Sequence, residues 1–185
     1  MKLILASKSP RRKELLSNAG FTYTIESKST KELMNDDLSV YQNVLNVSKE
    51  KAEAVFCDNK DACVLGCDTI VVLNNKIYGK PKDKNDAFNT LRLLSGKTHS
   101  VISGVCIITP NKTVQYYVES FVTFKELSDK DILDYIETGE PMDKAGSYAI
   151  QGIGAKLIDH YTGSFENIVG LPIDEVTKTL NEVLE

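Results

Sequence analysis

The sequence has few of the side chains that mark a metal-stabilised or disulfide-bonded domain. It contains four cysteines and two histidines among 185 residues, and the cysteines form no C-x-x-C pair. A zinc site is therefore not expected, and we interpret the cysteines as buried thiols of a protein in a reducing compartment. His99 and His160 lack the spacing of metal ligands, so we expect both to have structural roles.

Long apolar runs and a basic excess are also lacking. No apolar stretch reaches the roughly 18 residues that a membrane span needs. The mostly apolar residues 1–6 are too few for a signal peptide, and basic residues follow them at once. The net charge of −4 argues against nucleic acid as a partner, because proteins that bind the phosphate backbone usually carry a basic excess. We therefore expect a cytoplasmic protein that binds neither a membrane nor nucleic acid.

Two common nucleotide-binding fingerprints are missing as well. Neither G-x-x-x-x-G-K-[ST] nor G-x-G-x-x-G occurs, so a Walker loop and a dinucleotide-binding loop are not predicted. Internal repeats and low-complexity linkers are absent too. The 42% of hydrophobic residues suffices for a full core, and the length fits one domain or two very small ones.

Strand and helix patterns alternate along the chain. Apolar runs and period-two alternation predict strands over residues 3–6, 21–25, 63–73, 76–78, 99–108, 114–124 and 156–159. Capping residues and helical spacing predict helices over residues 10–20, 40–56, 86–94, 129–136 and 173–184. This order predicts a mixed α/β fold with a central sheet and flanking helices, in which the long strand pair produces two lobes.

The start of the first predicted helix carries positive charge where acids are normally favoured. Ser9 is suited to the N-cap, and the first turn then holds Arg11, Arg12 and Lys13. A helix N-terminus already carries about half a positive charge, so the basic residues conflict with it. An anionic ligand would resolve the conflict, because free backbone N–H groups, the Ser7 and Ser9 hydroxyls and two guanidiniums can together hold a polyphosphate. The alternative is a solvated basic patch on an amphipathic helix.

Asp68 interrupts the most apolar segment of the chain, residues 63–73. An unpaired buried carboxylate is costly, so a strand interior accepts one mainly where it meets a metal, a cation or a substrate. The alternative is a structural ion pair with a lysine. Glu32, in the polar stretch 26–39, is a candidate metal partner of Asp68. Lys51 lies on a helix rich in charge, where a solvated role is the default.

Two glycine-containing segments are suited to contact a ligand. Lys80 lies between Gly79 and Pro81, which fix the backbone and present the cation rigidly. The stretch 139–154 is rich in glycine, so its backbone can approach a ligand closely, and it contains Gln151. Surface turns with no function have similar sequences, and this alternative stays open for both segments.

Several blocks in this sequence closely resemble the signatures of the Maf family. These blocks are LASKSPRRKELL at 5–16, GCDTIV at 66–71, GKPKD at 79–83, LSGKTH at 94–99, TGEPMDKAG at 138–146, IQGIGA at 150–155, GS at 163–164 and NIVGLP at 167–172. They lie in order over nearly the whole chain. Residues 1–185 are therefore identified as a single Maf-like nucleotide pyrophosphatase domain.

The resemblance implies a fold like that of the inosine triphosphate pyrophosphatases, with a cleft between two lobes. It also implies hydrolysis of a nucleoside triphosphate at the α-phosphate, with release of pyrophosphate and with a divalent metal, Mg or Mn. Carried over by position, Asp68 would be the general base or a metal-supported activator of water, and Glu32 would join it in binding the metal. The remaining residues implied to line the phosphate and metal site are Ser7, Arg12, Lys51, Lys80 and Gln151.

Three positions separate the subgroups of the family that this chain resembles. They are Arg11, Thr69 and Gln151 here, and this trio resembles the dTTP/UTP subgroup rather than the one that acts on 7-methyl-GTP. The chain departs from the family pattern just before Glu32, where further acids are usual.

Two alternative functions remain: a sanitiser of modified pyrimidine nucleotides, and a regulator of septum formation that binds a nucleotide without turnover. The resemblance leaves a homodimer open.

Overall fold

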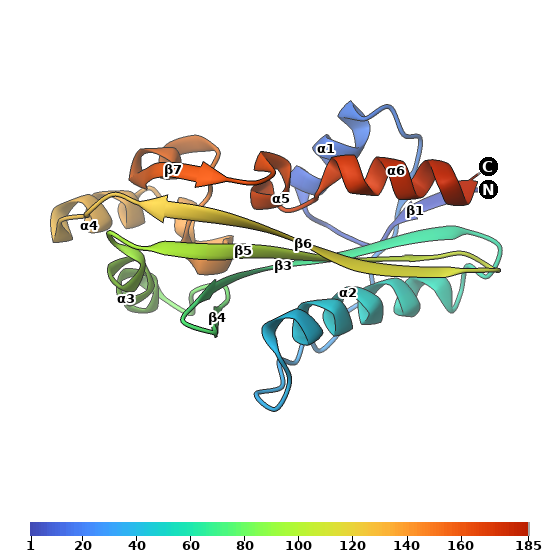
Figure 1. Cartoon of the computed structure of the whole chain (residues 1–185), viewed down its shortest axis with the longest axis horizontal. Coiled ribbons are helices and arrows are strands. Elements are labelled where there is room, and N and C mark those ends of the chain that lie inside the picture. Colours follow the sequence, from blue (N-terminus) through green and yellow to red (C-terminus); the bar gives the residue numbers. More distant parts are fainter. Residues whose placement is uncertain (185) are drawn as a thin grey trace. The chain divides into compact units, whose positions relative to one another are not determined.

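The computed structural model describes residues 1–184, and its strands form one mixed seven-stranded sheet (Figure 1). The strand order is β2-β1-β3-β5-β6-β7, with β4 paired to β3. β1 runs parallel to β2 and β3, whereas the β3–β4 and β6–β7 pairs are antiparallel. The strands are β1 (Leu3–Leu5), β2 (Thr24–Ile25), β3 (Cys63–Leu73), β4 (Lys76–Tyr78), β5 (Thr98–Ile108), β6 (Thr113–Phe124) and β7 (Ile158–Thr162).

Helices alternate with these strands, which confirms the predicted α/β class. The α-helices are α1 (Pro10–Asn18), α2 (Val40–Phe56), α3 (Lys84–Leu94), α4 (Asp129–Glu137), α5 (Phe165–Val169) and α6 (Ile173–Leu184). Three short 3-10 helices are η1 (Glu140–Asp143), η2 (Ala145–Ser147) and η3 (Gly152–Leu157). No helix within residues 1–184 is long and apolar enough to cross a membrane.

The chain divides into two compact units. Of the described residues, the first unit contains 1–69, 103–118 and 170–184, and the second contains 70–102 and 119–169. Strands β3, β5 and β6 each run from the residues of one unit into those of the other. Two units agree with the two predicted lobes, whereas the cleft and the likeness to inosine triphosphate pyrophosphatases stay predictions.

The first unit has an apolar core on each face of its strands. On one face, side chains of β1, β3 and β5 pack with Leu16 of α1 and with Val176 and Leu180 of α6. On the other face they pack with Ala52 and Val55 of α2. Period-two alternation assigns the side chains to the two faces, because successive residues of a strand point to opposite sides. The odd-numbered residues over 63–67 of β3 therefore face α1 and α6, and Val64 faces α2.

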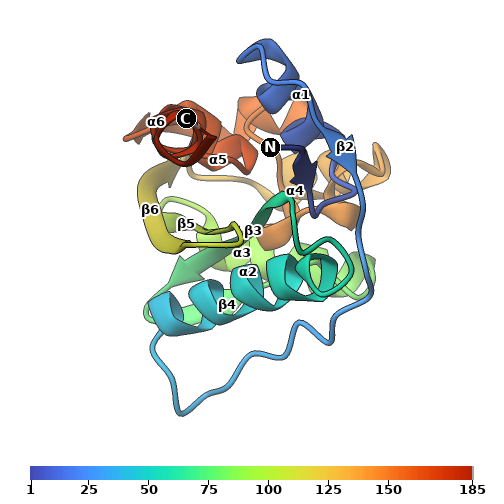
Figure 2. The same cartoon turned by 90° about the vertical axis from the view of Figure 1, so that its right-hand side faces the viewer.

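Helix α2 lies unusually close to β3 and β5 (Figure 2). A Cβ atom on Gly66 would lie 2.4 Å from the Ser48 carbonyl oxygen, and one on Gly104 would lie 2.5 Å from that of Val44. Any side chain at these two positions would push the helix away. The Ser39 side chain caps α2 in a capping box with Gln42, which fixes where the helix begins.

The second unit contains a buried aromatic cluster. The rings of His99, Phe124 and Tyr148 meet edge to face, with centroids 4.8 to 5.4 Å apart. His99 Nε2 and the Tyr148 hydroxyl share a hydrogen bond of 2.7 Å. His99 therefore has the structural role that was predicted for it.

Several predicted boundaries are wrong. The strand predicted over 21–25 is reduced to β2, because the Phe21 N–H donates to the Leu16 carbonyl and prolongs the end of α1. The strand predicted over 156–159 begins at Ile158, because the residues before it form η3. The third helix begins two residues before 86, where the Asp83 side chain caps it. Cys57 is exposed rather than buried, since it lies at the end of α2.

Candidate active site

The site begins where β1 gives way to α1. Ser7 follows β1 and is buried, and its hydroxyl accepts a hydrogen bond from the Ser9 N–H at 3.2 Å. The Ser9 side chain caps α1 by accepting from the Arg12 N–H at 3.5 Å, and Pro10 occupies the first turn. The first turn contains no acidic residue. The sequence thus builds a helix N-terminus with two hydroxyls and no internal anion.

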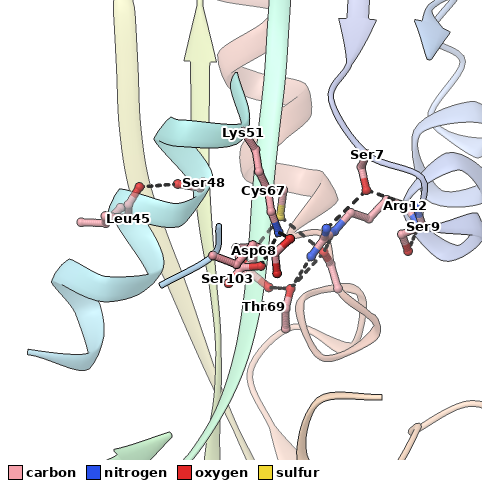
Figure 3. A network of polar contacts seen from close by, with 12 residues as sticks. Ser7, Ser9, Arg12, Leu45, Ser48, Lys51, Cys67, Asp68, Thr69 and Ser103 are labelled. Atoms are coloured by element: carbon pink, nitrogen blue, oxygen red, sulfur yellow. Dashed lines mark hydrogen bonds and ion pairs between the residues drawn. The ribbon is translucent and has the colours of Figure 1, made fainter. Parts of the chain in front are cut away.

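Arg12 is held by three acceptors, all within the first unit (Figure 3). Its Nε donates to the Gly170 carbonyl at 2.7 Å, and one terminal nitrogen donates to the Thr69 hydroxyl at 3.0 Å. The other terminal nitrogen lies 3.4 Å from the Ser7 hydroxyl oxygen. For this residue the alternative of a solvated basic patch is wrong, because the guanidinium is anchored in one orientation.

Asp68 is paired with Lys51, which approaches from α2 (Figure 3). The Lys51 Nζ lies 2.7 Å from Asp68 Oδ1, and the two side chains are 14% and 11% exposed. The same Nζ lies 3.0 Å from Glu32 Oε1, whose side chain is 52% exposed. The predicted default of a solvated Lys51 is wrong, and the ion pair that was one alternative for Asp68 is present.

Glu32 adopts a backbone conformation that is uncommon for its residue type. Its φ of 44° lies in the left-handed region, which favours glycine. It belongs to the loop that leads from β2 to α2, which is blue in Figure 2. Its carboxylate nonetheless reaches the nitrogen that also holds Asp68. This loop therefore places a second carboxylate beside the Asp68–Lys51 pair.

Thr69 links the Arg12 side of the site to the sheet. Its hydroxyl oxygen lies 2.8 Å from the Ser103 hydroxyl of β5 and 3.2 Å from the Gly170 carbonyl oxygen. Sequence reasoning missed Ser103, which is a small polar residue within the apolar part of β5. The Gly170 carbonyl was also missed as an acceptor, although the residue lies in one of the Maf-like blocks.

Asp68 and Thr69 lie on a part of β3 that extends past its neighbour. The pairing of β1 with β3 ends at Leu5 and Leu65, followed by the bond from the Ala6 N–H to the Leu65 carbonyl. Because successive residues of a strand point to opposite faces, Asp68 faces α2 and Thr69 faces α1. The carboxylate and the arginine thus lie on two sides of one strand, near the carboxyl end of β1, where α/β sheets usually bind ligands.

Cys67 precedes Asp68 in β3, and its thiol is not a candidate nucleophile. The thiol is buried and lies 3.4 Å from the Gly170 carbonyl oxygen, to which it donates a weak hydrogen bond. Burial raises the pKa of the Cys67 thiol, so the protonated form is favoured. A nucleophile requires the thiolate, and Cys67 is therefore part of the scaffold of the site.

The family assignment follows from comparison with known proteins. A family model described as "Maf-like protein" matches residues 2–183. The chain belongs to the Maf family. Three similar relatives are named dTTP/UTP pyrophosphatase, from Bacillus pumilus, Bdellovibrio bacteriovorus and Aquifex aeolicus. They are 48%, 44% and 43% identical, over 96%, 97% and 99% of this chain and 94%, 97% and 96% of their own lengths.

The predicted site residues of this Maf protein fall into two groups. The first unit brings Asp68, Lys51 and Glu32 into contact, and it brings Arg12 into contact with Ser7 and Thr69. Arg11 is half-buried beside Arg12. Lys80 and Gln151 belong to the second unit, where both are exposed. In that unit the Gly146 N–H donates to the Gly79 carbonyl at 3.1 Å, which fixes the turn before Lys80.

The donor set of the first unit is compatible with a hard cation. Within residues 1–184 no group of three or more His, Cys, Asp or Glu side chains could hold a metal ion by itself. Asp68 and Glu32 offer carboxylate oxygens that converge on one ammonium group. Mg²⁺ is commonly held by one or two carboxylates together with substrate phosphates and water, and two carboxylates fit this pattern.

Proposed function

We propose that this Maf protein hydrolyses nucleoside triphosphates to a monophosphate and pyrophosphate, with dTTP and UTP as preferred substrates. The observation that carries the proposal is that two neighbouring residues of β3 hold groups of opposite charge. Thr69 holds the anchored guanidinium of Arg12, and Asp68 is a carboxylate bound by Lys51. A triphosphate requires both cations that neutralise developing charge and a carboxylate that orients water or metal. The names of the relatives support the same reaction and the same substrates.

The phosphate-binding part of the proposal rests on the start of α1. Arg12 presents a planar fork that is already oriented by Ser7 and Thr69, so little side-chain entropy remains to be lost on binding. The helix N-terminus adds backbone N–H groups and a favourable dipole. Lys80 contributes a further cation in this proposal, on the strength of its Maf-like block.

The catalytic part rests on Asp68. Its carboxylate is the general base that accepts a proton from the attacking water, and Lys51 holds it in one orientation at 2.7 Å. Asp68 and Glu32 are the proposed ligands of a divalent cation, which would supply Lewis-acid stabilisation of phosphate charge. Lys51 lies between the two carboxylates and balances part of their charge.

The base-selecting part rests on Gln151, with Arg11 and Thr69. An amide can donate and accept at once, which matches the O4 and N3–H edge of uracil and thymine. The Thr69 hydroxyl is engaged with Arg12, Ser103 and Gly170, so we expect Thr69 to act through the position of Arg12.

A pyrophosphate-release screen over common and modified triphosphates tests this function. We expect kcat/KM for dTTP and UTP to exceed that for ATP and GTP by at least about tenfold, because a site that hydrogen-bonds its substrate rejects mismatched analogues. Gln151→Ala should reduce this preference more than it lowers kcat.

Three outcomes of this screen would change the proposal. Equal efficiency with purines would refute the base preference alone. Higher efficiency with modified pyrimidines would favour a sanitiser. Nucleotide binding without turnover would refute the enzyme.

A further inference from the structure

The glycine-rich loop of the second unit is fixed by two side chains that the proposed function leaves unassigned. The Glu140 carboxylate accepts from the Gly154 N–H at 2.8 Å and from the Ile153 N–H at 3.1 Å. The Tyr135 hydroxyl accepts from the Ala149 N–H at 3.3 Å. The loop over residues 149–154 is therefore held at both ends.

The two side chains also hold each other, and we call them the Tyr135–Glu140 clamp. The Tyr135 hydroxyl donates to Glu140 Oε2 at 2.7 Å. Tyr135 is 3% exposed at the end of α4, so its ring has little freedom. Burial raises the pKa of the phenol, and the bond to Glu140 raises it further, so the hydroxyl remains a donor. Bonds to an ionised carboxylate are stronger than neutral ones, which makes the clamp a rigid support.

The glycines of the loop are fitted to this clamp. A Cβ on Gly152 would lie 2.3 Å from Glu140 Oε1, and one on Gly154 would lie 2.7 Å from the Tyr135 hydroxyl oxygen. Gly152 also has a φ of +75°, which favours glycine. The fold therefore requires glycine at positions 152 and 154, where the loop passes over the two side chains.

The glycine-rich sequence predicted that the backbone of this loop approaches a ligand, and the clamp argues against that role for its N–H groups. A glycine-rich loop can bind an anion with its N–H groups. Here a carboxylate of the protein already occupies the N–H groups of Ile153 and Gly154. Between the fixed ends Gln151 and Gly152 are exposed, and of these two only Gln151 has a side chain. What the loop offers a ligand is thus the side chain of Gln151.

We propose that Tyr135 and Glu140 are positioning residues for base selection, which they support by fixing the loop that carries Gln151. The inference rests on the proposed function, in which Gln151 contacts the base. Neither residue touches the substrate. Their effect is to restrict the backbone of Gln151, so that its amide meets the O4 and N3–H edge of the pyrimidine without first being ordered.

The test measures kcat/KM for dTTP and ATP in Glu140→Gln, Tyr135→Phe, Gln151→Ala and the Glu140→Gln/Gln151→Ala double variant. Glu140→Gln keeps the shape but turns an amide nitrogen toward backbone donors, and Tyr135→Phe removes the hydroxyl that joins the two ends. Asp131→Asn is the matched control, because it removes the charge of the carboxylate that accepts from the Ser128 N–H at the other end of α4. Thermal unfolding is recorded for every variant.

We expect the dTTP-to-ATP ratio of kcat/KM to fall at least about fivefold in Glu140→Gln and in Tyr135→Phe. In the Glu140→Gln background, Gln151→Ala should lower the ratio by less than about twofold further, because the two changes act through one contact. Asp131→Asn should lower the unfolding temperature and leave the ratio unchanged.

A merely structural role predicts a different result. Folded Glu140→Gln and Tyr135→Phe proteins that keep the ratio of the unaltered protein, or a double variant whose losses multiply, would overturn the inference. If Glu140→Gln does not fold, Tyr135→Phe with its own Gln151→Ala double variant decides in the same way. An unaltered protein that releases no pyrophosphate would refute the proposed function, and with it this inference. A preference that no clamp variant changes refutes the inference alone.

Discussion

At the scale of single residues, Arg12 shows how a surface cation becomes fixed. Its three hydrogen-bond partners are a hydroxyl after β1, a hydroxyl on β3 and a carbonyl after α5. The basic start of α1 predicted an anion site, but it could not predict the bonds to Thr69 and Gly170, because these residues lie far away in the sequence. The bonds also leave the guanidinium oriented before any ligand arrives, which lowers the entropy lost on binding.

Replacement of Arg12 tests this arrangement. Arg12→Ala should lower kcat/KM for dTTP by about tenfold to a hundredfold, and Arg12→Lys should restore part of the loss, because lysine lacks the planar fork. The helix dipole alone predicts unchanged or higher stability without the cation. The hydrogen bond to the Gly170 carbonyl reverses this expectation, and we expect a lower unfolding temperature. A destabilised Arg12→Ala protein with normal kinetics would instead indicate a structural arginine.

Asp68 gives a second prediction at this scale. Asp68→Asn removes the charge and keeps the shape, so turnover of dTTP should fall by about 10²–10⁴-fold, as expected for loss of a general base. The protein should stay folded, because Lys51 keeps its contact with Glu32.

The matched control is Asp58→Asn, which removes an exposed partner of Lys28 and should leave turnover unchanged. Turnover by Asp68→Asn at the level of the unaltered protein, measured at saturating Mg²⁺ or Mn²⁺, would remove Asp68 from the catalytic role.

At the scale of elements, the strongest sequence patterns give the right boundaries. The apolar run of β3 and the helical pattern of α2 were predicted with the bounds that the structure has, because long patterns average out local exceptions. Helix α5 was not predicted, since its five residues are too few to show a period. The start of β7 was predicted too early, because the residues before it form η3. Gly152, with its positive φ, permits the turn at the start of η3.

The close contact of α2 with β3 gives a prediction for this element. Gly66→Ala places a Cβ 2.4 Å from the Ser48 carbonyl oxygen, so α2 must move away from the strand. We expect a loss of about 1–3 kcal/mol of stability, typical of overpacking. Because α2 carries Lys51, turnover should fall by more than the lost stability explains.

Ala54→Gly provides the control for Gly66→Ala. It costs α2 about 1 kcal/mol of helix propensity without changing the contact with β3. Urea unfolding and dTTP turnover measured on both variants separate the two effects. Equal specific activity of the folded fractions would show that the spacing of α2 does not matter for the site.

At the scale of the whole molecule, the resemblance to the Maf family predicted more of the candidate site than local sequence patterns did. Local reasoning singled out Asp68 and the basic helix start, and the structure pairs each with the partners described above. It gave Lys51 the wrong environment, because its ion-pair partner Asp68 lies on another element. The assignments of Lys80 and Gln151 came from their blocks, and their roles stay predictions.

The stability of the whole chain should depend on pH through His99. Burial lowers the pKa of His99 from 6.5 to about 4, and within residues 1–184 its Nδ1 is a buried atom with no hydrogen-bond partner. Below pH 6.5 the unfolded chain therefore binds a proton that the folded chain excludes. Stability should fall between pH 6.5 and about 4, by roughly 1 kcal/mol per pH unit from this group.

Urea unfolding at pH 7, 5.5 and 4.5 measures this dependence. His99→Gln should flatten it, because glutamine does not titrate, although the variant starts from a lower stability. His160→Gln is the control, since His160 is exposed and pairs with Asp159. An unchanged slope in His99→Gln would show that other groups cause the acid sensitivity.

During translation, Arg12 leaves the ribosome 158 residues before Gly170, whose carbonyl accepts from its Nε. At about 5–20 residues per second, this interval lasts on the order of ten seconds. During that time β1 and α1 have been synthesised, but residues 170–184, which complete the first unit, have not. A nascent chain therefore lacks the Gly170 acceptor of Arg12 until residue 170 has emerged. If Arg12 binds phosphate as proposed, we expect chains that extend past this point to bind a triphosphate more tightly than shorter ones.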